Sequence, residues 1–328
     1  VALETPMPKV LISDKLSEAA VQIFRDKGVD VDFQPDLGKD PAKLKEIISN
    51  YDGLAIRSAT KATAEIIDAA DNLKVIGRAG IGVDNIDLAA ASAKGVVVMN
   101  TPFGNSITTA EHAIAMMLSL TRGLTQQAKK MPEGNWNRSI GGEIGMMSVD
   151  GKTALVVGLG GIGKAAAKRS AALGMRVIAT RNSSRSGPDY VDYVGLSDEL
   201  FELAAQADVV INALPLTPET EGIMNSDLFA ALPDHAVIIH AGRGPQLVEA
   251  DLINALDDKQ IAHAVIDVFA QEPLPEDNPL WARPDVTITP HIASAPDGEE
   301  QAVQIAEAIR KIEAGEQPDH VVDRTRGY

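Results

Sequence analysis

The chain has 328 residues, of which 45% are hydrophobic, and it carries a formal net charge of −16. Its length allows two domains, each with a sizeable core. The acidic excess excludes a general affinity for nucleic acid or for an anionic membrane surface, and the absence of cysteine excludes disulfides, thiolate catalysis and cysteine-based metal sites.

No apolar run reaches the ~18 residues that a membrane span needs, and the first residues have neither the basic region nor the apolar core of a secretory signal. We therefore expect a cytoplasmic protein that binds neither nucleic acid nor membranes. No histidine pair has a metal-ligand spacing such as H-E-x-x-H, so we expect no metal site.

Short apolar runs alternate with helical segments along the first hundred residues. Strands are expected at 9–14, 29–33, 53–56, 73–76 and 96–99, and helices at 17–27, 41–50, 62–70 and 86–94. This alternation predicts a parallel sheet with helices on both faces. Turn residues at 100–105 interrupt the pattern, and a helical stretch from about 106 to 130 is expected to connect two domains.

A second series of the same kind begins at Gly151. Strands are expected at 153–157, 176–180, 209–213, 236–239, 262–267 and 286–289, and helices at 162–173, 197–206, 226–232 and 250–257. The last helical stretch, about 297–314, is expected to cross back onto the first domain. The chain is therefore predicted to be an α/β protein with two doubly wound parallel-sheet domains.

A G-x-G-x-x-G motif follows the strand at 153–157 and opens the next helix. Gly158 allows the tight turn, Gly160 lets the backbone approach a pyrophosphate, and Gly163 lets the helix pack on the strand. The amide groups of the first helical turn then face the phosphates, where the helix dipole favours negative charge. This context predicts dinucleotide binding; the alternative is a tight turn that binds nothing.

Reactive side chains follow several of the expected strands. Arg243, Glu272 and His291 do so in the second series, and Arg57, Arg78 and Asn100 in the first. Ligands of open parallel sheets bind beyond the carboxyl ends of the strands. If both edges face one cleft, that cleft holds a histidine, a carboxylate, arginines and a dinucleotide.

This set of groups suits hydride transfer to a 2-oxoacid. Arginine holds a carboxylate or carbonyl oxygen with paired hydrogen bonds, and histidine gives a proton to the developing alkoxide near neutral pH. A carboxylate beside the histidine favours the imidazolium and fixes the ring. Taken singly, each residue has an alternative role, as a surface ion-pair partner or a capping residue. We expect structural roles for His112, His235, His263 and His320, and His240 is a weak candidate because it lies near Arg243.

The chain resembles the D-isomer-specific 2-hydroxyacid dehydrogenase family over nearly its whole length, and residues 53–122 most resemble D-3-phosphoglycerate dehydrogenase. The resemblance is carried by Arg-Ser-Ala-Thr-Lys-Ala-Thr (57–63), Gly-Arg-Ala-Gly-Ile-Gly-Val-Asp-Asn-Ile-Asp (77–87), Asn-Thr-Pro-Phe-Gly-Asn-Ser-Ile-Thr-Thr-Ala-Glu-His (100–112), Leu-Pro-Leu-Thr-Pro-Glu-Thr (214–220), Gly-Arg-Gly (242–244), Asp-Val-Phe (267–269), Glu-Pro-Leu-Pro (272–275) and Thr-Pro-His-Ile-Ala (289–293).

The resemblance implies an NAD(P)-dependent oxidoreductase that acts on the CH–OH group of a 2-hydroxyacid, with Arg243, Glu272 and His291 as catalytic residues. It also implies a flavodoxin-like substrate domain at 1–103 and 292–328, an inserted Rossmann domain at 104–291, and a homodimer formed through the Rossmann domain. The expected substrate-binding residues are Arg57, Ser58, Arg78, Gly80, Ile81, Gly82 and Asn105. The expected cofactor-binding residues are Gly158, Gly160, Gly161, Ile162, Gly163, Thr180, Arg181, Asn182, Ser183, Arg185, Leu214, Pro215, Thr220 and Asp267, the last at the nicotinamide amide.

Three features depart from the family pattern. Arg181 stands where an acidic residue usually ends the second strand of the nucleotide domain, His240 stands in place of an asparagine, and the chain ends soon after its last helical stretch, so we expect no regulatory domains. Arginine and hydroxyl donors at 181–185 suit a 2′-phosphate, so we predict a preference for NADP over NAD. The alternative is a solvated loop that accepts both cofactors.

The leading functional hypothesis is a reductase of small 2-oxoacids such as hydroxypyruvate and glyoxylate, with His291 as the general acid/base. The close alternative is D-3-phosphoglycerate dehydrogenase, because Arg57 and Arg78 would suit the anionic tail of 3-phosphohydroxypyruvate. A third hypothesis, of a different class, is a dinucleotide-sensing protein like the corepressors that share this fold.

Overall fold

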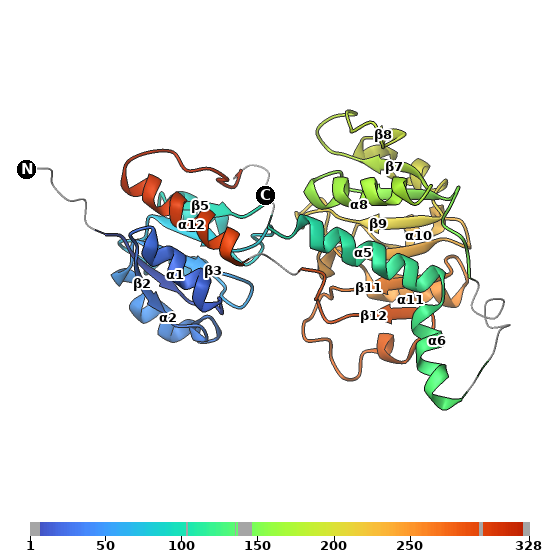
Figure 1. The fold of residues 1–328 in the computed structure, drawn as a ribbon, viewed down its shortest axis with the longest axis horizontal. Helices are drawn as coiled ribbons and strands as arrows, with labels where there is room; N and C mark the ends of the chain where they lie inside the picture. The colour runs from blue at the N-terminus through green and yellow to red at the C-terminus, as the bar shows by residue number, and fades with distance from the viewer. Residues whose placement is uncertain (1–6, 103, 135, 137–145, 295–297, 324–328) are drawn as a thin grey trace, which may run out of the picture. The chain divides into compact units, whose positions relative to one another are not determined.

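The computed structural model describes residues 7–102, 104–134, 136, 146–294 and 298–323. The chain forms two compact units, the first from Val1–Asn105 with Pro296–Tyr328 and the second from Ser106–Ala295 (Figure 1). These limits differ slightly from the boundaries expected at 103/104 and 291/292. Gly104 packs against Gln301 of the first unit, whereas the amides of Ile292 and Ala293 are bound by Asp267 of the second.

The first unit contains a five-stranded parallel sheet with the order β2-β1-β3-β4-β5, which is the flavodoxin-like order. Its strands are β1 (Lys9–Ile12), β2 (Asp30–Phe33), β3 (Gly53–Ile56), β4 (Val75–Arg78) and β5 (Val97–Asn100). Its helices are α1 (Glu18–Asp26), α2 (Pro41–Ile47), α3 (Ala64–Asp68), α4 (Leu88–Ala93) and α12 (Gly298–Glu313), with 3-10 turns at Leu37–Lys39 and Ile48–Asn50.

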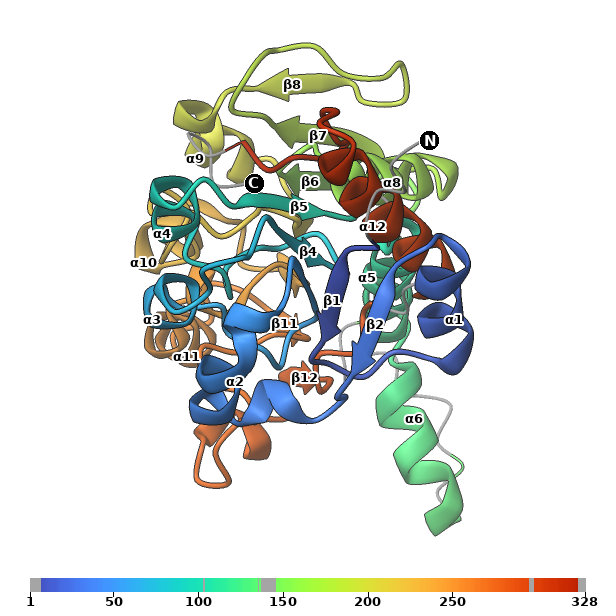
Figure 2. The ribbon, with the colours of Figure 1, turned by 90° about the vertical axis from the view of Figure 1, so that its left-hand side faces the viewer.

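Alternating side chains of this sheet build two cores. Val10 and Ile12 of β1 face α1 and α12, which lie side by side on one face (Figure 2). Leu11, the residue between them, joins the core under α2, α3 and α4 on the other face. The strands are therefore buried on both sides, as the continuous apolar runs predict.

The second unit contains a seven-stranded parallel sheet with the order β12-β11-β10-β9-β6-β7-β8. Its strands are β6 (Thr153–Val157), β7 (Arg176–Thr180), β8 (Tyr193–Gly195), β9 (Val209–Asn212), β10 (Val237–His240), β11 (His263–Ile266) and β12 (Val286–Ile288). Its helices are α5 (Ser106–Thr121), α6 (Leu124–Lys130), α8 (Gly161–Ala172), α9 (Leu200–Ala204), α10 (Ser226–Ala231) and α11 (Glu249–Asp257), with 3-10 turns at Met131–Glu133, Ser197–Glu199, Gly244–Gln246 and Pro279–Ala282.

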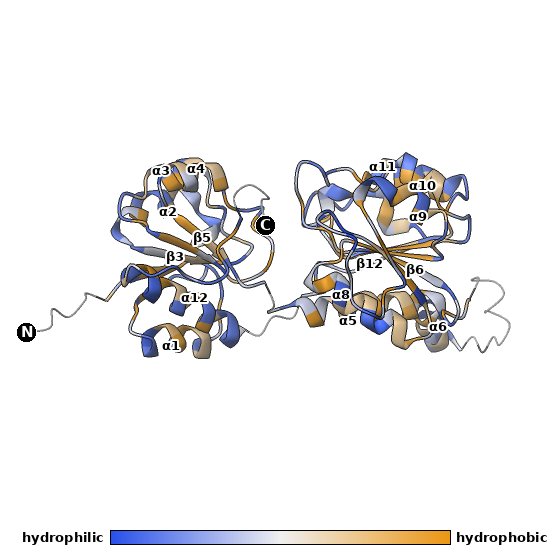
Figure 3. Cartoon of the chain, turned by 90° about the horizontal axis from the view of Figure 1, so that it is seen from above, coloured by the Kyte–Doolittle hydropathy of each residue, from blue (hydrophilic) through white to orange (hydrophobic). Residues whose placement is uncertain are grey.

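Helices cover both faces of this sheet as well. α5 and α8 pack on one face, and α9, α10 and α11 pack on the other. Figure 3 shows the apolar strands enclosed between the two helical layers of each unit. In both units the predicted α/β fold class and the doubly wound parallel sheets are confirmed.

One local prediction was wrong, and one strand was missed. The stretch 106–130 is not one helix, because Gly123 adopts a left-handed conformation with φ of 62° between α5 and α6. The strand β8 was not predicted, since its three residues follow a long polar loop and show no period-2 pattern of their own; pairing with β7 forms it. In the described ranges, no helix is long and apolar enough to cross a membrane.

Candidate functional site

The glycine-rich loop lies at the carboxyl end of β6. Gly158 has φ of 93°, which L side chains rarely adopt, and its amide donates to Thr180 Oγ1 at 3.3 Å. A Cβ at Gly163 would lie 1.9 Å from the Gly158 carbonyl oxygen, whereas a Cβ at Gly160 would meet nothing within 4 Å. Space therefore remains on the side of Gly160 where a phosphate would approach.

The first turn of α8 is suited to an anion. The helix begins at Gly161, its N-cap Gly160 offers no side-chain acceptor, and no acidic residue lies in the first turn. Its amide groups, among them those of Gly161 and Ile162, are therefore open to an external acceptor at the positive end of the helix dipole.

The loop after β7 carries hydrogen-bond donors and no acidic side chain at its start. Arg181 Nη1 donates to the backbone oxygen of Ser186 at 3.0 Å and to its Oγ at 3.4 Å. Ser184 and Ser186 share a hydrogen bond, while Asn182 and Ser183 are exposed. Within the described residues, Arg181 has no carboxylate partner, so its charge is available to an anionic ligand.

Arg185 is placed differently from Arg181. Its guanidinium pairs with Glu199 and donates to the hydroxyl of Tyr193 at 2.9 Å. The hydrogen bonds from Arg185, Tyr193 and the Leu196 amide lower the pKa of Glu199 to about 2. Arg185, predicted to bind the cofactor, is thus already engaged by a carboxylate that stays ionised at neutral pH.

The turn that begins at Leu214 lies beside the glycine loop. A Cβ at Gly158 would come within 2.9 Å of the Leu214 side chain. Thr220 Oγ1 donates to the Pro215 carbonyl at 2.7 Å and accepts from the Thr217 amide at 2.8 Å. Thr220 therefore closes this turn from within, and Leu214 and Pro215 flank the predicted phosphate position.

His291 and Glu272 form a hydrogen-bonded pair on the same edge of the sheet. Nδ1 of His291 lies 2.7 Å from Glu272 Oε2, so Nε2 is the nitrogen left for a ligand. Both side chains are partly exposed, at 38% and 35%. Burial alone would raise the pKa of Glu272, but the hydrogen bonds from His291 and the Phe269 amide and the charges of His291 and Arg243 outweigh it, so its pKa is lowered.

The third predicted catalytic residue, Arg243, follows β10. Its Nη1 donates to the Gly242 carbonyl at 3.0 Å, and its backbone amide donates to Gln246 Oε1 at 2.9 Å. Its positive charge is one of the causes that lower the pKa of Glu272, so Arg243 acts on the His291–Glu272 pair. The sheet of the second unit therefore assembles the three residues at one edge.

Asp267, predicted to meet the nicotinamide amide, binds the segment around His291. Its side chain is fully buried, and Oδ1 accepts from Thr289 Oγ1 at 2.6 Å and from the Ile292 amide at 3.0 Å. Oδ2 accepts from the Ala293 amide at 2.9 Å, which leaves one lone-pair position on Oδ2. Asp267 thus holds the two sides of the turn in which His291 adopts φ of 54°.

His112, for which a structural role was predicted, contacts two residues beside the candidate site. Its Nε2 lies 3.3 Å from Thr289 Oγ1 and 3.6 Å from Asp267 Oδ1. It belongs to α5 and lies far from Thr289 and Asp267 in the sequence, so these contacts form only because α5 packs on the sheet. His235 Nε2 lies 2.8 Å from Asp208 Oδ1.

The carboxyl edge of the first unit gathers most of its predicted residues. Arg78 is buried, and its guanidinium lies against Gly80 and donates to the Ala79 carbonyl and to Ser58 Oγ. The Gly80 amide donates to Thr101 Oγ1 at 2.7 Å. The backbone amides of Ile81 and Gly82 make no hydrogen bond with any described residue. These two amides can therefore bind a carboxylate.

A buried carboxylate, Asp14, organises the loop that holds Arg57. It accepts hydrogen bonds from the Arg57 amide and from the amide and hydroxyl of Thr60. Asn85 Nδ2 donates to the carbonyls of Arg57 and Thr60 at 2.7 Å each. The Arg57 side chain is partly exposed and donates to the Lys15 carbonyl. Asp14 and Asn85 were not predicted, although Asp14 lies two residues after the end of β1.

Asn105, also predicted to bind substrate, is partly buried and is the last residue of the first unit's N-terminal segment.

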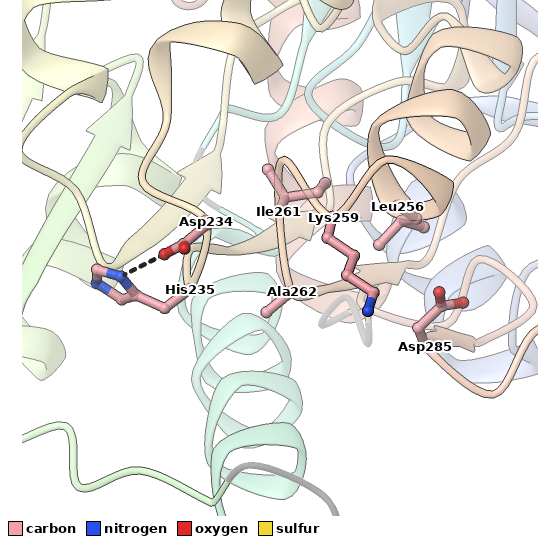
Figure 4. A pocket seen from close by; sticks show the side chains of 7 residues that line it. All are labelled: Asp234, His235, Leu256, Lys259, Ile261, Ala262 and Asp285. Carbon is pink, nitrogen blue, oxygen red and sulfur yellow. Dashed lines mark ion pairs between the residues drawn. The ribbon is translucent and has the colours of Figure 1, made fainter.

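A depression of about 540 Å³ lies at the opposite, amino edge of the second sheet (Figure 4). Its lining includes Asp234 and His235 before β10, Lys259, and Asp285 before β12. Asp285 is paired with Arg283, and the predicted catalytic residues follow strands rather than precede them, so this depression is separate from the site.

Comparison with known proteins identifies related sequences. A family model described as D-isomer specific 2-hydroxyacid dehydrogenase, NAD binding domain, matches residues 114–293. The chain is 39% identical over 288 residues to D-3-phosphoglycerate dehydrogenase of Archaeoglobus fulgidus, a match that covers 88% of this chain and 53% of that protein. The chain spans about half the length of the first curated relatives that it matches.

Two solved structures are similar in fold. A protein from Thermus thermophilus has a TM-score of 0.85 and 32% identity, with 96% of this chain and 100% of that chain covered. An NADPH-dependent glyoxylate/hydroxypyruvate reductase from Sinorhizobium meliloti, solved with NADP and malonate, has a TM-score of 0.81 and 28% identity, with 97% of each chain covered.

We predict that Asp267→Asn lowers the free energy of unfolding by about 1–3 kcal/mol, because its amide nitrogen would face a buried donor that now binds a carboxylate oxygen. The measurement is a denaturant titration of the wild-type and variant chains. Asp258→Asn is the matched control, since Asp258 is exposed at the end of α11. A loss no larger than that of the control would contradict the role of Asp267.

Proposed function

Since the chain belongs to the D-isomer-specific 2-hydroxyacid dehydrogenase family, we propose that it reduces small 2-oxoacids to D-2-hydroxyacids with a nicotinamide dinucleotide. The observation that carries the proposal is the His291–Glu272 pair, 2.7 Å apart, on the sheet edge that also bears the glycine loop. In this proposal the second unit binds the dinucleotide and the first unit binds the substrate.

The residues present fit a dinucleotide. The open side of Gly160 and the uncapped first turn of α8 suit the pyrophosphate, and Arg181 suits a phosphate on the adenosine ribose. The nicotinamide ring, when bound, supplies the hydride. Asp267, which the resemblance assigns to the ring's amide group, is fully buried, so it would bind that group only if the residues that cover it move.

His291 completes the reaction as general acid. As hydride reaches the carbonyl carbon of the 2-oxoacid, negative charge develops on the carbonyl oxygen, and Nε2 of the imidazolium gives it a proton. The product is a hydroxyl group and a neutral imidazole, which takes a proton from solvent before the next turnover. Glu272 orients the ring through Nδ1 and stabilises the imidazolium. Arg243 binds the substrate oxygens with its planar set of donors.

The first unit supplies the groups for the substrate carboxylate. The amides of Ile81 and Gly82 are the proposed donors, because the Gly80 amide is bound to Thr101. Arg78 supports this loop from a buried position. Arg57, which is partly exposed, is better placed to bind a polar or anionic substituent beyond the carbonyl.

D-3-phosphoglycerate dehydrogenase activity is the second candidate. The 39% identity to a relative of that name and the partly exposed position of Arg57 favour it. The arginine after β7 and the similarity to an NADPH-dependent glyoxylate/hydroxypyruvate reductase favour the general reductase, which we propose as the principal function.

We also propose that the protein is a homodimer that associates through the second unit. Helix α6 buries none of its residues, and Leu124, Met131 and Trp136, in and just after it, are 57%, 43% and 75% exposed. An apolar set of this kind is typical of a surface covered by another chain.

The proposal is tested by steady-state reduction of glyoxylate, hydroxypyruvate and 3-phosphohydroxypyruvate with NADPH and with NADH. We expect the highest kcat/KM for hydroxypyruvate with NADPH, and we expect His291→Asn to lower turnover by about 10²–10⁴-fold through loss of the general acid. A kcat/KM dominated by 3-phosphohydroxypyruvate would establish the second candidate. Tight dinucleotide binding without reduction of any acid would contradict both.

Glu272→Gln should move the alkaline limb of the pH profile for reduction to lower pH, because the imidazolium loses the carboxylate that stabilises it. The lowered pKa of Glu272 keeps it ionised at neutral pH, so its effect is present above that pKa and is lost as the pH falls through it. The measurement is kcat/KM against pH, with the exposed Glu276→Gln as control. An unchanged profile would count against the pairing.

Arg181→Asp should lower the ratio of kcat/KM for NADPH to that for NADH by about 10–100-fold, since a hydrogen bond to a charged group contributes about 1.5–3 kcal/mol. Arg185→Gln is the matched control, because Arg185 is already paired with Glu199 and should change the ratio less. Equal effects of the two substitutions would show that Arg181 is not the residue that selects the phosphate.

A further inference from the structure

Three fully buried polar side chains meet where β9 and β10 end. Asn212 is 1% exposed, and His240 and Gln246 are 0% exposed. Asn212 and His240 are direct neighbours in the sheet register, and Gln246 ends the 3-10 turn that follows Arg243. The mechanism above uses none of the three.

Their hydrogen bonds fix the orientation of each amide. Gln246 Oε1 accepts from Asn212 Nδ2 at 3.0 Å and from the Arg243 amide at 2.9 Å. Gln246 Nε2 donates to the carbonyls of Leu214 at 3.2 Å and Pro215 at 2.8 Å. Both lone-pair positions and both hydrogens of the Gln246 amide are thus used.

Asn212 is satisfied in the same way. Its Oδ1 accepts from the Leu214 amide at 3.2 Å, and one Nδ2 hydrogen goes to Gln246. The other faces His240 Nδ1 at 3.1 Å. Nδ1 must therefore be the acceptor, and the proton of the neutral ring lies on Nε2.

The state of His240 agrees with this arrangement. Burial lowers the pKa of His240 to about 4, with a smaller opposing effect from the backbone of Arg243. The ring is therefore neutral at physiological pH. Its Nε2 makes no hydrogen bond with the described residues, and Nδ1 is the ring atom that joins the network through Asn212.

The network joins two segments that the reaction needs. One holds the backbone of Arg243, and the other is the Leu214–Pro215 turn beside the glycine loop. We propose that Asn212, His240 and Gln246 are positioning residues that lock the catalytic arginine loop and the dinucleotide-flanking turn in a single arrangement. This inference rests on the proposed function in assigning Arg243 to substrate and the turn to the dinucleotide.

Close packing at Gly242 also holds the Gln246 and Asn212 amides in these positions. A Cβ at Gly242 would lie 2.3 Å from Gln246 Oε1 and 3.0 Å from Asn212 Nδ2. The residue before Arg243 therefore has no room for a side chain while the amides occupy these positions. An apolar residue at 246 would remove the hydrogen bonds that Gln246 makes with the Arg243 amide and the Leu214 carbonyl, and it would leave the Pro215 carbonyl with Thr220 Oγ1 alone.

The decisive variants are Gln246→Met and Gln246→Glu. The first removes all four hydrogen bonds at similar volume, so we expect kcat to fall by about 10–100-fold, as for a displaced catalytic group, and the dissociation constant for NADPH to rise. The second keeps an oxygen for the Arg243 amide but places another against the Leu214 and Pro215 carbonyls. We expect it to weaken NADPH binding more than it lowers kcat.

Two comparisons separate positioning from a general loss of stability. In an Arg243→Ala background, Gln246→Met should change kcat little, because the arginine that it positions is gone. Leu252→Ala, in the core under α11, is the control for stability, and we expect it to lower the melting temperature without changing kcat or NADPH affinity. A full effect of Gln246→Met in the Arg243→Ala background would overturn the proposal.

Amide hydrogen exchange of the full chain tests the network without an activity assay. Gln246→Met should speed exchange at Arg243 and Leu214, whose amides lie in the network, and Leu252→Ala should not do so selectively. Unchanged exchange at both amides would overturn the network even if the enzyme is active. Faster exchange in a chain that reduces no 2-oxoacid would leave the network standing and contradict only the proposed function.

Discussion

The buried carboxylate of Asp267 is the constraint on which the candidate site depends. It follows β11, at the edge where the strands of the second sheet end, and it binds a hydroxyl and two amides of the segment on either side of His291. A fully buried carboxylate is tolerated only where donors surround it. The donors here come from the one turn that must present the imidazole, so the same contacts that satisfy the charge also fix the position of His291.

In the first unit, the carboxylate of Asp14 holds a loop in place in the same way. This buried carboxylate follows β1 and binds the amides of Arg57 and Thr60. It therefore anchors the loop of Arg57, a residue proposed to bind the substrate. In both units an acidic residue at a strand end shapes the loops through backbone amides.

Around Arg243, neutral polar groups instead of a carboxylate hold the backbone in place. A carboxylate at position 246 could accept from Asn212 and the Arg243 amide, but it could not donate to two carbonyls. An amide does both, because it carries two hydrogens and two lone-pair positions on one planar group. The choice of glutamine and of a neutral histidine follows from this balance of donors and acceptors, and the histidine in place of the usual asparagine fits it through a single acceptor nitrogen.

The sequence by itself determined the two parallel sheets, the glycine loop and the strand ends that carry Arg243, Glu272 and His291, because apolar runs and glycine spacing are local signals that act within one βα unit. It did not determine the break at Gly123, the strand β8, the ion pair of Arg185 with Glu199, or the contacts of Asp14, His112 and Gln246. Apart from the break at Gly123, each of these depends on a partner from another part of the chain: β8 needs the edge of β7, and His112 reaches Asp267 only because α5 packs on the sheet. Tertiary structure decided them, since a hydrogen bond between residues distant in the chain exists only once both backbones are in place.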